Sequence, residues 1–290
     1  MDEKRTEIIS IVIPAKNEAI AIGDTVKGIV RLFPNAEVLV VDDGSTDETA
    51  VLAEKAGARV LHQPYSKGNG AAIKAGLRAA SKDIVVCMDA DGQHRPEDIS
   101  LLLDKLKTGY DMVVGARSQE GQAGLHRSLA NGFYNAFASW MVGHRVEDLT
   151  SGFRAVRRIN FLEFISLLPN KFSYPTTITM SFFRAGYSVA YEPITVLKRA
   201  EGSKSHISLW KDGIRFLLII FKIGTLFSPL KLFFPISLML GSGGVSYYAY
   251  TYITDGRFTN MGALLFTTAM LVFLMGLVSE QITVLMYKEK

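Results

Sequence analysis

The sequence predicts an α/β domain followed by a membrane-associated tail. Short apolar runs alternate with helical stretches up to residue 88, and charged residues almost disappear after Lys231. The first run, residues 8–14, stops at a proline, and the second, residues 36–41, ends in two aspartates. Apolar runs of this length, bounded by turn signals, are typical of buried strands. Their alternation with helices predicts a parallel sheet with right-handed crossovers.

The elements follow in order along the chain. Strands are expected at residues 8–14, 36–41, 59–61 and 84–88, and helices at residues 18–33, 46–56 and 70–80. Asp42, Asp43, Asp89 and Asp91 directly follow two of these strands. Ligands of open α/β sheets gather beyond the carboxyl ends of the strands, so we expect all four carboxylates at one binding edge.

The tail predicts two transmembrane helices. Residues 232–254 and 261–279 carry no charged side chain, and roughly 20 apolar residues cross a ~30 Å hydrocarbon core. A pair of buried core helices is the weaker alternative, because only the short loop 255–260 separates the two runs. We therefore expect a domain at residues 1–205, an amphipathic interfacial helix at 206–230 and a two-helix membrane region at 231–290.

Charge predicts the orientation of these segments in the membrane. Basic residues precede the first span and follow the second, whereas the loop between the spans contains only Arg257. The positive-inside bias places the amino-terminal domain and both termini in the cytosol. The net charge of +4, with its basic cluster before the membrane, favours an anionic membrane surface or a phosphate ligand over nucleic acid.

Two further features of the tail bear on its environment and assembly. Lys211, Arg215 and Lys222 alternate with apolar residues, as in a helix that lies in the membrane interface. Glu280 falls near the end of the second span, where an acid is costly unless it is paired or close to water. Contact within a homo-oligomer and snorkelling to the interface both remain open.

The sequence Asp89-Ala90-Asp91-Gly92-Gln93 predicts a metal site. Two carboxylates and a carboxamide offer hard oxygen ligands, which suit Mg²⁺ or Mn²⁺ better than Zn²⁺. Two carboxylates in a loop are more often solvated turn residues, but their place after a buried strand favours the metal.

The sequence Lys67-Gly68-Asn69-Gly70 predicts a phosphate contact. It is an incomplete dinucleotide fingerprint and follows the third strand, which argues against a Rossmann dehydrogenase. A glycine-containing loop before a helix N-terminus still suits a diphosphate, so Lys67 is a candidate donor contact.

Six motifs in order resemble glycosyltransferase family 2, in particular the dolichyl- or polyprenyl-phosphate sugar synthases, through most of residues 8–205. They occupy residues 13–18 (IPAKNE), 41–45 (VDDGS), 89–93 (DADGQ), 114–117 (VGAR), 148–154 (DLTSGFR) and 199–204 (RAEGSK). The resemblance implies a GT-A-type nucleotide-diphospho-sugar transferase domain. It also implies a membrane-bound hexosyltransferase.

The resemblance further implies roles for residues that match its motifs. The donor-binding residues would be Pro14, Ala15, Asn17, Glu18, Asp42, Asp43, Asp89, Ala90 and Asp91, to which the glycine-containing loop adds Lys67. The metal ligands are Asp89, Asp91 and Gln93. The acceptor phosphate is bound by Arg117, Arg127, Asn131, Arg199, Ser203 and Lys204. The catalytic residues are Asp89, Asp91, Arg117 and Arg199.

Simpler roles are open for some of these residues. A lone arginine is by default a solvated charge, although its guanidinium also suits bidentate binding of phosphate. Asp148 is open to a role as the cap of the turn at residues 150–152, with Arg154 as its ion-pair partner.

The implied reaction transfers a hexose from a GDP-mannose or UDP-glucose type of donor to polyprenyl phosphate by one inverting displacement. A phosphate monoester has a second pKa of about 6, so the acceptor needs no histidine base. A processive polysaccharide synthase and a non-catalytic membrane scaffold are the alternatives. A processive synthase usually carries a Q-x-x-R-W signature, and neither Trp140 nor Trp210 belongs to such a motif. The donor sugar stays open, because residues 173–177 (SYPTT) differ from the acidic residues that relatives often carry there.

Overall fold

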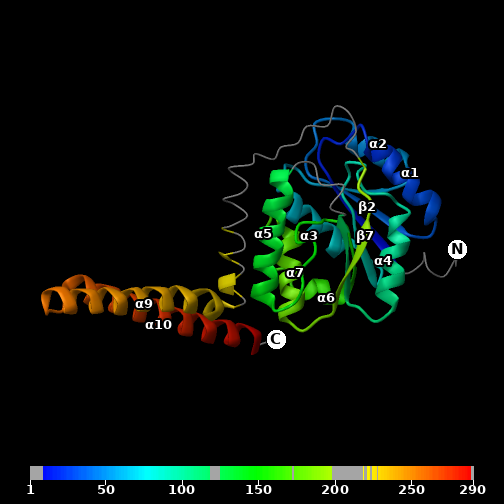
Figure 1. Ribbon diagram of the computed structural model, residues 1–290. Coiled ribbons are helices and arrows are strands. Elements are labelled where there is room, and N and C mark those ends of the chain that lie inside the picture. The colour runs from blue at the N-terminus through cyan, green and yellow to red at the C-terminus, as the bar shows by residue number, and fades with distance from the viewer. Residues whose placement is uncertain are drawn as a thin grey trace. The chain divides into compact units, whose positions relative to one another are not determined.

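The computed structural model describes residues 9–117, 125–171, 173–197, 218, 221–222, 224–226 and 228–288, without the side chains of 125–131 and 286–288. The chain divides into two compact units. The first comprises residues 1–139 and 144–216, and the second residues 140–143 and 217–290 (Figure 1).

The first unit is built on a seven-stranded sheet in the order β3-β2-β1-β4-β6-β5-β7. The strands are β1 Ile9–Ala15, β2 Glu37–Asp42, β3 Arg59–His62, β4 Ile84–Cys87, β5 Met112–Arg117, β6 Arg154–Arg157 and β7 Val189–Ile194. The predicted strands β1 to β4 are confirmed as neighbours that pair in parallel. Strand β6, which lies beyond the segment that predicted this parallel pairing, inserts antiparallel between β4 and β5.

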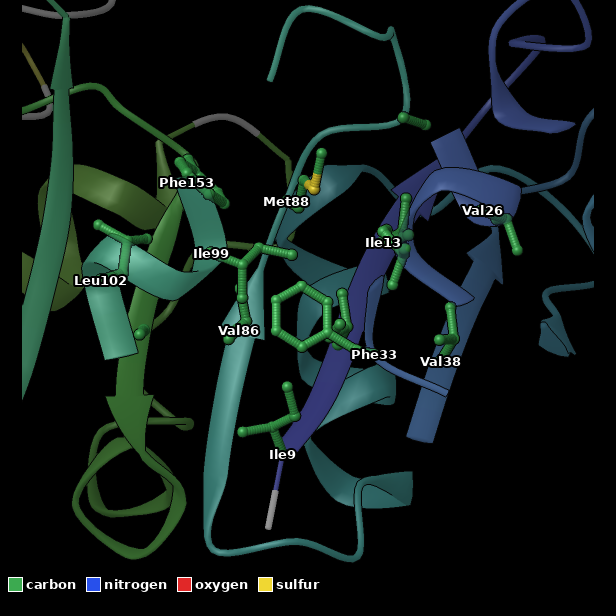
Figure 2. Close-up of a cluster of buried hydrophobic side chains, with 14 of the residues drawn as sticks. Ile9, Ile13, Val26, Phe33, Val38, Val86, Met88, Ile99, Leu102 and Phe153 are labelled. Atoms are coloured by element: carbon green, nitrogen blue, oxygen red, sulfur yellow. The ribbon is translucent and has the colours of Figure 1, made fainter. Parts of the chain in front are cut away.

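Helices cover both faces of this sheet. They are α1 Ile22–Leu32, α2 Thr49–Lys55, α3 Asn69–Ala79, α4 Asp98–Lys107, α5 Leu125–Val142, α6 Arg158–Glu163 and α7 Tyr174–Arg184. Helices α1, α2 and α4 contribute to one buried cluster, in which Figure 2 shows Phe33 and Ile99 against the strand residues Ile9, Ile13 and Val86. Helices α3, α6 and α7 contribute to the other cluster. Cys87 is fully buried, as its place in an apolar strand predicts.

The second unit contains two long apolar helices, α9 Pro229–Asp255 and α10 Asn260–Lys288. Each is long and apolar enough to cross a membrane, and only 11% and 17% of their apolar windows are buried within the structure. That exposure differs from a core helix of a soluble protein, so the prediction of two membrane-spanning segments is supported. Most of the expected interfacial helix at 206–230 lies outside the described residues.

Glu280 has a role inside this unit that the sequence interpretation did not consider. Its Oε2 accepts a hydrogen bond of 3.2 Å from the backbone N–H of Leu230, in the first turn of α9. A carboxylate at a helix N-terminus satisfies an otherwise unpaired N–H and complements the helix dipole. Glu280 therefore has a partner within the hairpin. This contact is a third explanation for the acid, beside contact in a homo-oligomer and snorkelling to the interface.

Candidate active site at the carboxyl ends of the strands

The two aspartates of the predicted metal motif lie just beyond β4. The Met88 N–H still donates to the Val12 carbonyl, and the chain then turns at Gly92, which has a φ of +72°. The Gln93 N–H donates to Asp91 Oδ1 at 3.1 Å. Asp91 is buried, whereas the side chain of Asp89 is 37% exposed. The turn thus presents one sheltered carboxylate and one open carboxylate at the same edge of the sheet.

Asp89 is held in its ionised form by positive neighbours. Burial by itself would raise the pKa of Asp89, but a hydrogen bond from His94 and the charges of His94, Arg117 and Arg154 outweigh it and lower the pKa. His94 Nε2 lies 3.4 Å from Asp89 Oδ2. The His94 ring stacks on Phe153 with a centroid separation of 4.9 Å, which fixes its orientation. Asp89 is therefore ready to bind a cation at neutral pH.

Gly152 presses directly against this carboxylate. A Cβ atom at residue 152 would lie 2.9 Å from Asp89 Oδ2 and 3.0 Å from Oδ1. The Gly152 carbonyl accepts a 3.0 Å hydrogen bond from the Tyr174 hydroxyl, which keeps the backbone in place. Only glycine allows this approach of the backbone to Asp89, so the turn before β6 forms one wall of the site.

Arg117 and Asp148 form a bidentate ion pair beside Asp89. Arg117 Nε donates to Asp148 Oδ2 at 2.7 Å and Nη2 donates to Oδ1 at 2.8 Å, while Nη2 also donates to Thr150 Oγ1. Burial would lower the pKa of Arg117, but the hydrogen bond and charge of Asp148 raise it. The guanidinium of Arg117 is thus charged and aimed by Asp148.

Asp148 performs the predicted capping but has a different ion-pair partner. Its Oδ1 accepts from the N–H groups of Thr150 and Ser151, each at 3.1 Å. Of the two roles left open for this motif, the ion pair of Asp148 with Arg154 does not form: Arg154 is fully buried on β6 and donates to the carbonyls of Ser151 and Pro175. Asp148 faces Arg117 because β5 and β6 are neighbours in the sheet.

The residues predicted to bind the donor lie partly in the turns after β1 and β2. Asn17 adopts a left-handed φ of 55°, and its Oδ1 accepts from the Thr46 N–H at 2.8 Å. The Glu18 N–H donates to Thr49 Oγ1 at 2.9 Å, and Asp42 Oδ1 accepts from the Ser45 N–H at 3.0 Å. These bonds join the turn after β1 to the turn after β2 and place the predicted donor residues side by side.

Several backbone N–H groups around the start of α3 have partners within the protein. The carboxylate of Asp43 accepts from the N–H groups of Lys67 at 2.7 Å and Gly68 at 2.9 Å. The Gly70 and Ala71 N–H groups donate to the carbonyls of Lys171 and Asn170, at 3.2 and 2.8 Å. These four N–H groups are therefore paired within the protein, and Lys67 stays a predicted donor contact through its ammonium group. Lys67 Nζ lies over the ring of Tyr65, 5.4 Å from its centroid.

The donor set at Asp89 and Asp91 suits a hard divalent cation. Within the described part of the chain no group of three His, Cys, Asp or Glu residues converges on one point. Mg²⁺ commonly keeps several waters and takes only one or two carboxylates together with substrate phosphates. Two carboxylates at an open edge therefore fit the ion. Gln93 Nε2 donates to the Leu197 carbonyl at 3.3 Å, so any metal contact of Gln93 would use its oxygen.

The structure does not describe several of the residues predicted to bind the acceptor phosphate. Arg199, Ser203 and Lys204 fall outside the described residues, and the side chains of Arg127 and Asn131 fall outside them too. The sequence interpretation also missed residues that the structure brings to the site. His94 is five residues after Asp89, and Gly152 and Arg154 belong to a motif already noticed, but no local spacing indicates that this motif folds against Asp89.

Comparison with known proteins now identifies the family. Residues 10–177 match the profile of Glycosyl transferase family 2. This chain belongs to glycosyltransferase family 2. Residues 228–285 of the family 2 chain match the GtrB C-terminal hairpin, which coincides with α9 and α10.

Individual relatives of this family 2 protein agree with that assignment. Glycosyltransferase AglJ of Haloferax volcanii is 30% identical over 289 residues, which cover 95% of this chain and 94% of the relative. The polyprenol monophosphomannose synthase of Mycolicibacterium smegmatis is 30% identical over 212 residues, covering 68% of this chain and 80% of the relative.

A solved structure confirms the expected GT-A-type fold. Glucosyl-3-phosphoglycerate synthase from Mycobacterium tuberculosis, crystallised with Mn²⁺ and UDP-glucose, superposes with a TM-score of 0.60 at 25% identity. The match covers 76% of this chain and 81% of that structure.

Proposed function

We propose that this protein transfers a hexose from a nucleotide-diphosphate sugar to a polyprenyl phosphate at a membrane surface. One observation carries the proposal most directly. The ionised, partly exposed Asp89 lies just beyond the carboxyl end of β4, where the charge of Arg117 acts on it. The same chain carries two candidate membrane spans. A cation site beside a fixed guanidinium suits a reaction between two phosphate-bearing substrates.

The donor would bind along the ends of β1, β2 and β4. Pro14 and Ala15 pair with Val41 and Asp42 at the carboxyl ends of β1 and β2, and the turn at Asn17 and Glu18 extends this surface. Asp43 acts on the donor indirectly, because its carboxylate holds the loop at Lys67 and Gly68. Ala90 lies between the two metal-site aspartates.

Asp89 and Asp91, with the carboxamide oxygen of Gln93, would hold Mg²⁺ or Mn²⁺. When bound, the ion supplies positive charge to the diphosphate as it departs from the sugar. The related fold that was crystallised with Mn²⁺ and UDP-glucose supports this use of the edge. The chain's own contribution is to keep Asp89 ionised, through His94 and the neighbouring arginines.

The acceptor phosphate would meet Arg117, with Arg127, Asn131, Arg199, Ser203 and Lys204 as further proposed contacts. A lipid monophosphate is already anionic near neutrality, since a phosphate monoester has a second pKa of about 6. Its oxygen forms a bond to the anomeric carbon while the bond from that carbon to the diphosphate oxygen breaks. The electron pair leaves with the nucleoside diphosphate, and the anomeric configuration inverts. Positioning by Arg117 and Asp148 would carry much of the catalysis.

The membrane segments would keep the acceptor within reach of the site. We propose a catalytic domain at 1–205, an interfacial helix at 206–230 and a membrane hairpin at 231–290, with the catalytic domain and both termini in the cytosol. The name of the mycobacterial relative supports a polyprenyl acceptor and a mannose donor. GDP-mannose and UDP-glucose are the first donors to try.

The test is transfer of radiolabelled sugar from UDP- and GDP-sugars to polyprenyl phosphate, with Mg²⁺ or Mn²⁺, by the full chain in detergent. We expect a metal-dependent lipid product carrying one sugar, lost in Asp91→Ala and kept in Asp104→Ala. Asp104 is a matched control because it is half exposed and pairs with Lys107 on α4. Several sugars on each lipid would indicate a processive synthase. No transfer from any donor by folded protein would contradict the proposal and favour a scaffold.

A further inference from the structure

Arg154 is a buried cation whose hydrogen-bond acceptors in the described part of the chain are all uncharged. Its residue is fully buried, and its Nη1 donates to the Pro175 carbonyl at 3.3 Å and to Thr179 Oγ1 at 3.2 Å. Its Nη2 donates to the Ser151 carbonyl. All of these acceptors are neutral, and no carboxylate forms an ion pair with Arg154 within the described part of the chain. Burying a charge in this way is costly, so its retention calls for an explanation.

Two ionisable side chains beside Arg154, those of Cys87 and Tyr174, supply no negative charge near neutral pH. Burial raises the pKa of Cys87 to about 12 and raises the pKa of Tyr174 well above its ordinary value. Both side chains are therefore neutral near pH 7. The guanidinium lies over the Tyr174 ring, 5.6 Å from its centroid.

The bonds of Arg154 also join two elements that shape the site. Pro175 and Thr179 belong to α7, whereas Ser151 belongs to the turn that precedes β6. The same turn carries the Asp148 cap, which aims Arg117, and Gly152, which touches Asp89. Strand pairing places Arg154 opposite Cys87, two residues before Asp89.

We propose that Arg154 is a positioning residue whose hydrogen bonds tie the 148–152 turn to α7, so that Gly152, Asp148 and Arg117 stay arranged around Asp89 for a divalent cation and phosphate. This inference rests on the proposed function, because it assigns a support to that site. Arg154 contacts no substrate: it acts through the turn.

The test measures Mn²⁺ binding by electron paramagnetic resonance, using full-length protein with MnCl₂ and either UDP or GDP. Arg154→Met removes the charge and every N–H donor but keeps a long apolar side chain. Arg154→Lys keeps the charge but replaces the planar guanidinium by a single ammonium group. Because loss of an outer support typically weakens a metal site about 10- to 100-fold, we expect that loss in Arg154→Met and a smaller loss in Arg154→Lys. Arg157→Met is the matched control, since Arg157 is half exposed and lies 3.9 Å from Asp111.

The outcomes separate the support role from simple stability and from the proposed function. Binding is measured well below the unfolding temperature of each variant, so a purely structural role would leave the Mn²⁺ affinity unchanged. Equal affinity in the wild type and folded Arg154→Met would overturn the inference, as would failure of both Arg154 variants to fold. If only Arg154→Met fails to fold, the affinity of Arg154→Lys decides. No Mn²⁺ binding by the wild type would instead overturn the metal part of the proposed function.

Discussion

Arg117 and Asp148 meet through two parallel hydrogen bonds, of 2.7 Å from Nε and 2.8 Å from Nη2. The two residues are 31 positions apart in the chain, yet Asp148 also caps its own turn with the same carboxylate. Asp148 therefore couples the position of the guanidinium to the turn that supports Asp89. Phosphate and carboxylate offer similar geometry to a guanidinium. Because Asp148 binds Nε and Nη2 of Arg117, it also decides which N–H groups remain for the phosphate of the acceptor substrate.

Asp148→Asn should reduce both stability and transfer. The substitution keeps the shape of the side chain but replaces a charged acceptor, and hydrogen bonds to charged groups contribute about 1.5–3 kcal/mol. We expect a loss of that size in unfolding free energy and at least a tenfold rise in the acceptor KM. Glu147→Gln is the control, because Glu147 is exposed and pairs with exposed Arg145. An unchanged KM in Asp148→Asn would show that Arg117 needs no orientation by Asp148.

Stability should fall at acid pH partly through Asp148. Burial would raise the pKa of Asp148, but the hydrogen bond and charge of Arg117 outweigh it and lower the pKa. A lowered folded-state pKa means that this stabilisation is fully present above the unfolded value of about 3.9 and is lost as the pH falls through the folded value. Thermal unfolding measured from pH 7 down to about pH 2 should show a smaller acid-induced decrease in Asp148→Asn. Identical pH profiles for the two proteins would contradict this linkage.

Gly152→Ala should impair catalysis more than folding. The added Cβ would approach both oxygens of Asp89 to about 3 Å, so the carboxylate must move, and small displacements of positioned groups cost about 100-fold in rate. We expect kcat to fall by that order with a native circular dichroism spectrum. Gly23→Ala is the control, since a Cβ at Gly23 meets nothing within 4 Å in helix α1. Wild-type kcat in Gly152→Ala would show that Asp89 tolerates displacement.

Glu280→Leu should loosen the membrane hairpin, whereas Glu280→Gln should not. The Leu230 N–H needs an acceptor in the first turn of α9, and glutamine keeps a side-chain oxygen there while leucine removes it. Loss of a helix cap typically costs about 1 kcal/mol. The measurement is thermal unfolding in detergent of the full chain. Equal unfolding temperatures for the leucine and glutamine variants would indicate that the contact contributes little.

Local patterns alone were enough to predict several parts of this protein. The alternation of apolar runs and helical spacing correctly predicted β1 to β4 and α1 to α3, because each of these elements buries one continuous or periodic apolar surface. The uncharged tail predicted the helices α9 and α10 for the same reason. Carboxylates that follow strands predicted the binding edge, since parallel strands bring their carboxyl ends together.

Tertiary structure decided how the second half of the domain completes that edge. The antiparallel insertion of β6 between β4 and β5 brings Gly152 to Asp89 and Asp148 to Arg117. The carbonyls of Asn170 and Lys171 accept hydrogen bonds from the first turn of α3, a contact that the local sequence did not predict. These contacts join residues distant in sequence. The chain by itself determined which side chains follow the strands, but only long-range strand pairing and backbone hydrogen bonding decided which of them face one another.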